Sequence, residues 1–117
     1  MKRDMDLIRA MLLKAEEQPP YGPFTNMPAF PGHSDDEMRA HAELAQEAGL
    51  IEAEFMMVGF FIRRLTYSGH EFLDAAREDK LWNKAKETVI KNAGTLTMEA
   101  MKTALAALMQ KAARGIV

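Results

Sequence analysis

The sequence predicts an α+β fold, with a winged-helix-like core, a two-stranded antiparallel hairpin and a carboxyl-terminal helical extension. Two observations predict it: apolar residues recur at helical spacing in five segments, and residues 50–65 are rich in β-branched and aromatic side chains around one glycine. Strand and helix patterns do not alternate along the sequence, so it does not predict a parallel sheet. The 117 residues are 48% apolar and 27% charged, which suits one folded domain over residues 1–117.

The first helix and the loop after it are marked by opposite signals. Apolar residues recur every three or four positions from Met5 to Ala15, which predicts a helix over residues 4–17 with Asp4 at its amino end. Residues 18–32 contain all five prolines, whose missing amide donors exclude a helix. Four large apolar residues in this stretch predict that the loop packs across the domain, and one edge strand is considered within it.

The second helix and the hairpin carry the strongest local signals. Ser34 and Glu37 form a capping box that starts a helix, which Gly49 ends in a left-handed conformation. Residues 50–65 then predict two short strands joined by a turn at Gly59. Six large apolar residues, at positions 55–58 and 60–61, flank Gly59 in this turn. Either the chain's own loop or last helix covers them, or a partner does.

Three further helices are predicted after the hairpin. Thr66 caps the third helix, in which Gly69 permits close helix packing. Trp82 opens the buried face of a fourth helix near residues 81–93, with Ala85 and Val89 on the same face and Ile90 considered as a further member. Thr97 caps the last helix, whose apolar stripe comprises Met101, Leu105, Leu108 and Ala112.

Three motifs and one short cluster carry a resemblance to a known family. The motifs are MKRDMDLIR at residues 1–9, HAELAQEAGLI at 41–51 and LTYSGHEFLDAAR at 65–77, and the cluster is Trp82-Asn83-Lys84. The chain resembles the uncharacterised domain-of-unknown-function family twenty-five thirteen of small bacterial and phage proteins. Tyr67 and Ser68 stand where relatives more often show tryptophan and glutamate, which alters one surface patch. The resemblance implies a phage or prophage setting and a winged-helix-like body, and it supplies no catalytic residue.

The charge of the second helix and the hairpin favours a protein partner over DNA. Between residues 34 and 54 one arginine faces seven acidic residues, a local charge of −6 that would repel a duplex. We therefore predict a non-enzymatic protein that binds a partner with a basic surface through the acidic helix and the apolar hairpin turn. The candidate partner-binding residues are Asp35, Asp36, Glu43, Glu47, Glu52, Glu54, Met56 and Met57. In a phage setting we expect this partner to be a host nucleic-acid-handling or defence complex, which the protein inhibits by blocking its DNA-binding groove with the acidic face. A homodimer is the alternative.

A winged-helix transcriptional regulator that binds DNA is the alternative interpretation. Residues 55–117 carry ten basic against six acidic residues, so basic charge is displaced toward the carboxyl half. The candidate nucleic-acid residues are Arg63, Arg64, Lys84 and Lys86. Acidic residues interspersed among them favour an ordinary solvated face instead.

Enzymatic and metal-binding functions find little support in the sequence. No pair of histidines has zinc-ligand spacing, no phosphate-binding glycine loop occurs, and no nucleophile elbow accompanies Ser68 and His70. We interpret His41 and His70 as core or capping histidines, and we expect no catalytic residue, cofactor, metal or small-molecule substrate.

The compartment follows from cysteine usage and hydropathy. The chain has no cysteine, which suits a reducing cytoplasm, and the basic opening residues are followed at once by Asp4 and Asp6. No window reaches the roughly 18 to 20 apolar residues that a membrane-spanning helix needs. We therefore expect a cytoplasmic protein without a signal peptide, a membrane anchor or membrane binding.

Overall fold

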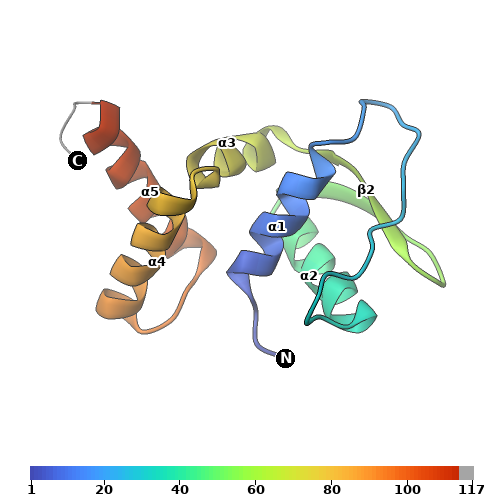
Figure 1. Cartoon of the computed structure of the whole chain (residues 1–117), viewed down its shortest axis with the longest axis horizontal. Coiled ribbons are helices and arrows are strands. Elements are labelled where there is room, and N and C mark those ends of the chain that lie inside the picture. Colours follow the sequence, from blue (N-terminus) through green and yellow to red (C-terminus); the bar gives the residue numbers. More distant parts are fainter. Residues whose placement is uncertain (114–117) are drawn as a thin grey trace. The chain divides into compact units, whose positions relative to one another are not determined.

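The computed structural model describes residues 1–113, and the chain divides into two compact units, Met1–Glu71 and Phe72–Val117 (Figure 1). The first unit contains α1 (Met5–Ala15), α2 (Asp35–Glu47), β1 (Ile51–Phe55) and β2 (Phe60–Leu65). The division falls within α3 (Tyr67–Ala76), and the second unit continues with α4 (Asp79–Ala93) and α5 (Met98–Ala113). The α+β class with a hairpin and carboxyl-terminal helices is confirmed, and the winged-helix assignment stays a prediction.

The core of the first unit forms where α1 packs against α2 and β2, while α2 packs against β1. Its largest fully buried side chains are Met5, Ile8, Met11, Leu12, Met38, Leu50, Ile51 and Ile62. These include the residues whose spacing predicted the first helix, and burying each large apolar side chain contributes about 1.5–3 kcal/mol. The apolar stripes of the two helices therefore fix the position of the hairpin.

Gly49 ends α2 and Ser34 caps it, as the sequence predicts. Of the predicted capping box only the serine half forms, because the Glu37 carboxylate contacts His33 Nδ1 at 3.2 Å. The Ser34 hydroxyl oxygen accepts a hydrogen bond from the Glu37 backbone N–H at 3.1 Å. At the other end Gly49 has a φ of 78°, and the Leu50 N–H donates to the Ala45 carbonyl at 3.0 Å. This arrangement satisfies a carbonyl of the last turn and leads the chain directly into β1.

The hairpin is antiparallel and contains one bulge. Glu52 pairs with Arg64 and Ala53 with Ile62, so Arg63 is the extra residue on β2. Because the bulge interrupts the alternation of faces, Arg63 and Arg64 are both exposed, whereas Ile62 is buried. Gly59, with a φ of 82°, lies in the turn as predicted.

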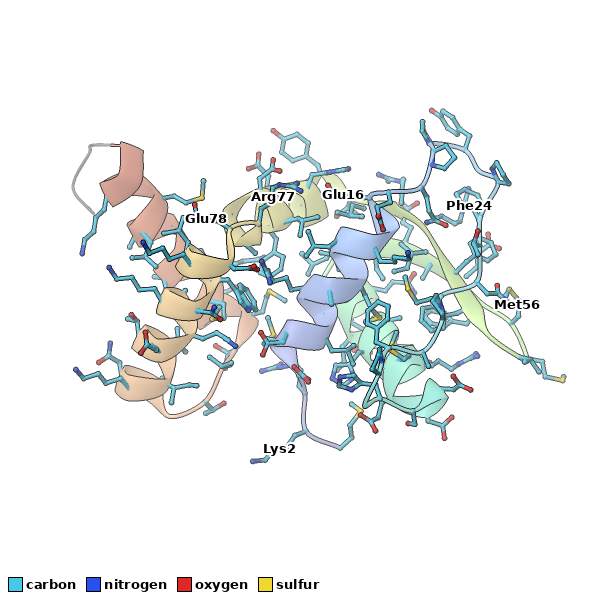
Figure 2. The ribbon with its side chains drawn as sticks, in the orientation of Figure 1. Lys2, Glu16, Phe24, Met56, Arg77 and Glu78 are labelled. Atoms are coloured by element: carbon cyan, nitrogen blue, oxygen red, sulfur yellow. The ribbon has the colours of Figure 1, made fainter. Side chains whose placement is uncertain are left out.

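Residues 18–32 pack along β2, as expected, but they contain no strand. The Gln18 side chain donates from Nε2 to the Ile62 carbonyl at 2.9 Å, and the Met27 N–H donates to the Phe60 carbonyl at 2.9 Å. Phe24, which Figure 2 labels, stacks its ring on that of Phe61 with centroids 5.1 Å apart. The edge-strand expectation is wrong because the prolines lack the amide donors that a strand ladder requires.

The second unit is a helical pair. Trp82, Ala85 and Val89 are buried on α4, which packs against α5, and the Phe72 ring meets Trp82 edge-on at 6.0 Å. Met101 and Leu105 of the predicted α5 stripe are buried, Leu108 is half-buried, and the side chain of Ala112 lies outside the described residues. Ile90, which the sequence left open as a further member of the buried face, is exposed because it lies about 100° around the helix from Val89.

Candidate functional site

The exposed face of the hairpin carries two ion pairs between its strands. Arg64 donates from Nε and Nη2 to the two carboxylate oxygens of Glu52, at 3.0 and 2.8 Å. The hydrogen bond from Arg64 lowers the pKa of Glu52. Arg63 Nε lies 3.7 Å from a Glu54 carboxylate oxygen. Two residues predicted to bind a basic partner are thus already paired with two residues predicted to bind DNA.

Arg39 joins α2 to the hairpin turn. Its Nη1 donates to the Met56 carbonyl at 2.7 Å, and its guanidinium lies 5.2 Å from the centroid of the Phe55 ring. Its Nε is 3.6 Å from a carboxylate oxygen of Glu43. The single basic residue of this region therefore positions the turn, and it partly neutralises Glu43.

An acidic groove forms between the first turn of α2, the hairpin turn and the long loop. It has a volume of about 350 Å³ and is lined by Asn26, Met27, Asp35, Asp36, Met38, Arg39, Met57, Val58, Gly59 and Phe60. The side chains of Asp35 and Asp36 make no ion pair with the described residues. Met57 is 100% exposed and Val58 84% exposed. The groove therefore unites two unpaired carboxylates with two apolar side chains that nothing in the described chain covers.

The predicted partner-binding residues divide into three groups. Asp35, Asp36 and Met57 line the acidic groove. Glu43, Glu52 and Glu54 are exposed but lie beside arginines, and Glu47 is exposed near the end of α2. Met56, which Figure 2 labels, is half-buried, and its carbonyl accepts a hydrogen bond from Arg39.

Sequence reasoning missed Asn26 and Val58 as groove residues. Asn26 belongs to the proline-rich loop, whose apolar content predicted packing without showing where the loop would lie. Val58 belongs to the apolar turn that the sequence did single out. For both residues, therefore, the sequence indicated the segment that lines the groove but not the position within it.

His41 is a buried structural histidine, as predicted. It is 1% exposed, its Nδ1 lies 2.7 Å from the Glu37 carbonyl, and its Nε2 accepts the Asp4 N–H at 2.8 Å. These partners define a neutral ring with the proton on Nδ1. The same interpretation of His70 is wrong: its side chain is exposed, because α3 presents that position to solvent.

His33 links the amino ends of the first two helices without forming a metal site. Its Nδ1 is 3.2 Å from a Glu37 carboxylate oxygen, and its Nε2 is 4.0 Å from an Asp4 carboxylate oxygen. Among residues 1–113, no group of three or more histidines and carboxylates has the geometry to hold a metal ion. Asp4 in turn caps α1 by accepting the Leu7 N–H at 3.2 Å.

We expect Glu37 to make the free energy of unfolding depend on pH. Hydrogen bonds from His33 and Ser34 lower the pKa of Glu37. Because the folded pKa is depressed, the stabilisation is present above the ordinary glutamate pKa of about 4.3 and is lost as pH falls through the folded value. Urea unfolding should therefore show Glu37→Gln less stable than wild type at neutral pH. The difference should shrink in acid, and an unchanged difference at pH values below the glutamate range would contradict this.

The four predicted nucleic-acid residues belong to different units. Arg63 and Arg64 lie on β2 in the first unit, whereas Lys84 and Lys86 lie on α4 in the second. Within the first unit both arginines have glutamate partners.

None of the described helices is both long enough and apolar enough to cross a membrane.

Comparison with known proteins places the chain in a family. A family model described as "Hypothetical protein (DUF2513)" matches residues 2–95. An uncharacterized protein of Haemophilus influenzae is 38% identical over 106 residues, which cover 87% of this chain and 90% of that protein. No solved structure matches. The chain therefore belongs to the DUF2513 family of hypothetical proteins.

Proposed function

We propose that this protein acts without catalysis by binding another protein that has a basic surface, through the acidic groove. The observation that carries the proposal is the meeting of Asp35 and Asp36 with the exposed Met57 and Val58 in one groove. We further propose a cytoplasmic phage or prophage setting, in which the partner is a host nucleic-acid-handling or defence complex.

Helix stability alone explains the carboxylates but not the apolar residues. Asp35 and Asp36 lie in the first turn of α2, where negative side chains are favourable because of the helix dipole. That effect gives no reason for Met57 and Val58 to be exposed beside them. Methionine is flexible and polarizable, which suits adaptable interfaces. A partner with a lysine or arginine flanked by apolar residues would satisfy both parts of the groove.

Electrostatics should govern how fast such a partner arrives. Long-range attraction between exposed charges is screened over about 8 Å at physiological ionic strength. Charges at the rim of an interface mainly change association rate and salt dependence. Capture should therefore weaken with added salt, and the apolar turn should control how long the complex persists.

Reversing one groove charge should weaken capture about tenfold, a loss of about 1.4 kcal/mol in binding free energy. We expect this of Asp36→Lys when the immobilised full chain captures its partner from a bacterial lysate, quantified by mass spectrometry. Glu71→Lys makes the same charge change at an exposed position that does not line the groove, and it should capture normally. Circular dichroism should show both variants folded, since Asp36→Lys costs only about 0.3–1 kcal/mol at the helix terminus.

Three other results would contradict the proposal. Equal capture by wild type and Asp36→Lys would exclude the groove. Duplex DNA binding by the wild-type chain that is lost in Arg63→Glu or Lys84→Glu, with the fold intact, would favour the DNA-binding alternative. Dimerisation of the pure chain that is lost in Met57→Ser would assign the groove to a second copy of the chain.

A further inference from the structure

A second groove lies near the open end of the hairpin, within the first unit. It has a volume of about 610 Å³ and is lined by Pro20, Tyr21, Phe24, Glu52, Arg63, Arg64, Leu65, Tyr67 and His70. The long loop, both strands and the first turn of α3 all contribute to it. We name it the tyrosine–arginine groove.

The two tyrosines of this groove are almost fully exposed, so neither ring contributes to the packing of the core. Tyr21 is 99% exposed and Tyr67 80% exposed. Tyr21 also has a φ of 66°, a left-handed conformation that a bulky residue rarely adopts. Strained backbone at an exposed aromatic residue is typical of binding sites, where the surrounding structure maintains it.

Arginines lie beside these aromatic rings. Arg63 and Arg64 line the groove with Glu52, so the lining has one more positive than negative side chain when His70 is neutral. The pairs with Glu52 and Glu54 are exposed, and exposed ion pairs are weak enough for another anion to compete. The pairing meanwhile holds the Arg64 guanidinium in a defined place, with Nη1 directed at the Leu65 carbonyl at 3.4 Å.

We propose that the tyrosine–arginine groove binds a short single strand of DNA or RNA. Bases stack on the rings of Tyr21 and Tyr67, and Arg63 and Arg64 contact the phosphates. Every base has a flat π face, so exposed aromatic rings beside basic side chains form the usual platform for single strands. The first unit carries twelve acidic against seven basic residues, which disfavours a duplex because a duplex needs many phosphate contacts. A short single strand of nucleic acid needs only a few phosphate contacts.

The test measures anisotropy of a fluorescein-labelled strand of about ten nucleotides, a length within the site sizes known for single-strand binding proteins. The full chain is titrated against oligothymidylate, oligouridylate and a duplex of equal length. We expect a single strand to bind more tightly than the duplex. The two single strands distinguish DNA from RNA as the preferred ligand.

Stacking and phosphate contacts are tested by separate variants. Tyr67→Ala should weaken binding between about fivefold and about a hundredfold, whereas Tyr67→Phe keeps the ring and should bind like wild type. Ile90→Ala, at an exposed apolar position that lines neither groove, is the control and should bind like wild type. Two phosphate contacts predict a slope of about −1.4 for log affinity against log salt, and Arg63→Gln should reduce its size by about 0.7.

Three outcomes would overturn the proposal. One is the absence of any anisotropy change with either single strand at about 50 mM salt. A second is equal affinity for duplex and single strand, and a third is unchanged binding in both Tyr67→Ala and Tyr21→Ala. If Tyr67→Ala instead loses a captured protein while no strand binds, the groove is a protein-docking surface.

Discussion

Gly69→Ala should destabilise the first unit by about 3 kcal/mol or more. A Cβ at this position would lie 3.0 Å from the Leu50 carbonyl carbon, closer still to its oxygen, and 3.3 Å from the Leu65 Cβ. The neighbour is backbone and cannot rotate away. Alanine is a better helix former than glycine by about 1 kcal/mol, but that gain is smaller than the cost of separating α3 from the end of α2.

The contact at Gly69 is reinforced by hydrogen bonds, so little relaxation is available. The Thr66 N–H donates to the Leu50 carbonyl at 2.9 Å, and the Gly69 N–H donates to the Thr66 hydroxyl oxygen at 3.0 Å. Ser68→Ala changes the adjacent exposed position and should alter stability by less than about 0.5 kcal/mol. Urea unfolding followed by circular dichroism compares the two variants. Equal stability of Gly69→Ala and wild type would show that the close approach is not maintained in solution.

His41→Ala should cost about 3 kcal/mol of unfolding free energy, the second large effect. The substitution empties a buried site and leaves the Asp4 N–H without the Nε2 acceptor that lies 2.8 Å away. Because Asp4 also caps α1, the loss should loosen the start of that helix from α2.

Hydrogen exchange provides a local measurement of the same change. In His41→Ala the amide of Asp4 and those of the first turn of α1 should exchange faster than in wild type. His70→Ala is the matched control, since it removes the same side chain from an exposed position and should leave both stability and exchange unchanged. Protection of the Asp4 amide that survives in His41→Ala would contradict the assigned hydrogen bond.

Local signals explain why most of the secondary structure could be predicted. Capping at Ser34 and Thr66, the helix end at Gly49 and the turn at Gly59 each depend on residues within about one helical turn. The edge-strand error arose at prolines that the sequence itself shows, whereas other mismatches arose where distant packing decides. Ile90 and His70 both fit an amphipathic pattern locally, yet the neighbouring elements leave them exposed.

The candidate sites were only partly predictable, for the same reason. The sequence identified an acidic helix and an apolar turn, of which Asp35, Asp36, Met57 and Val58 are exposed. It offered no sign that a bulge would expose both Arg63 and Arg64 beside Glu52 and Glu54. Tyr21 and Tyr67 are separated by 45 intervening residues in the chain, so their shared groove left no trace in local spacing.

By itself, therefore, the sequence determined the α+β class, the order of helices and hairpin, the caps that bound them and the family resemblance. These depend on interactions between near neighbours in the chain and on motifs read directly. Only the tertiary structure decided which charges are paired, which apolar residues stay uncovered and which distant side chains line one groove. Those outcomes depend on how the loop of residues 18–32 and α2 pack against the hairpin, and packing between distant segments is set by the whole core and not by any local pattern.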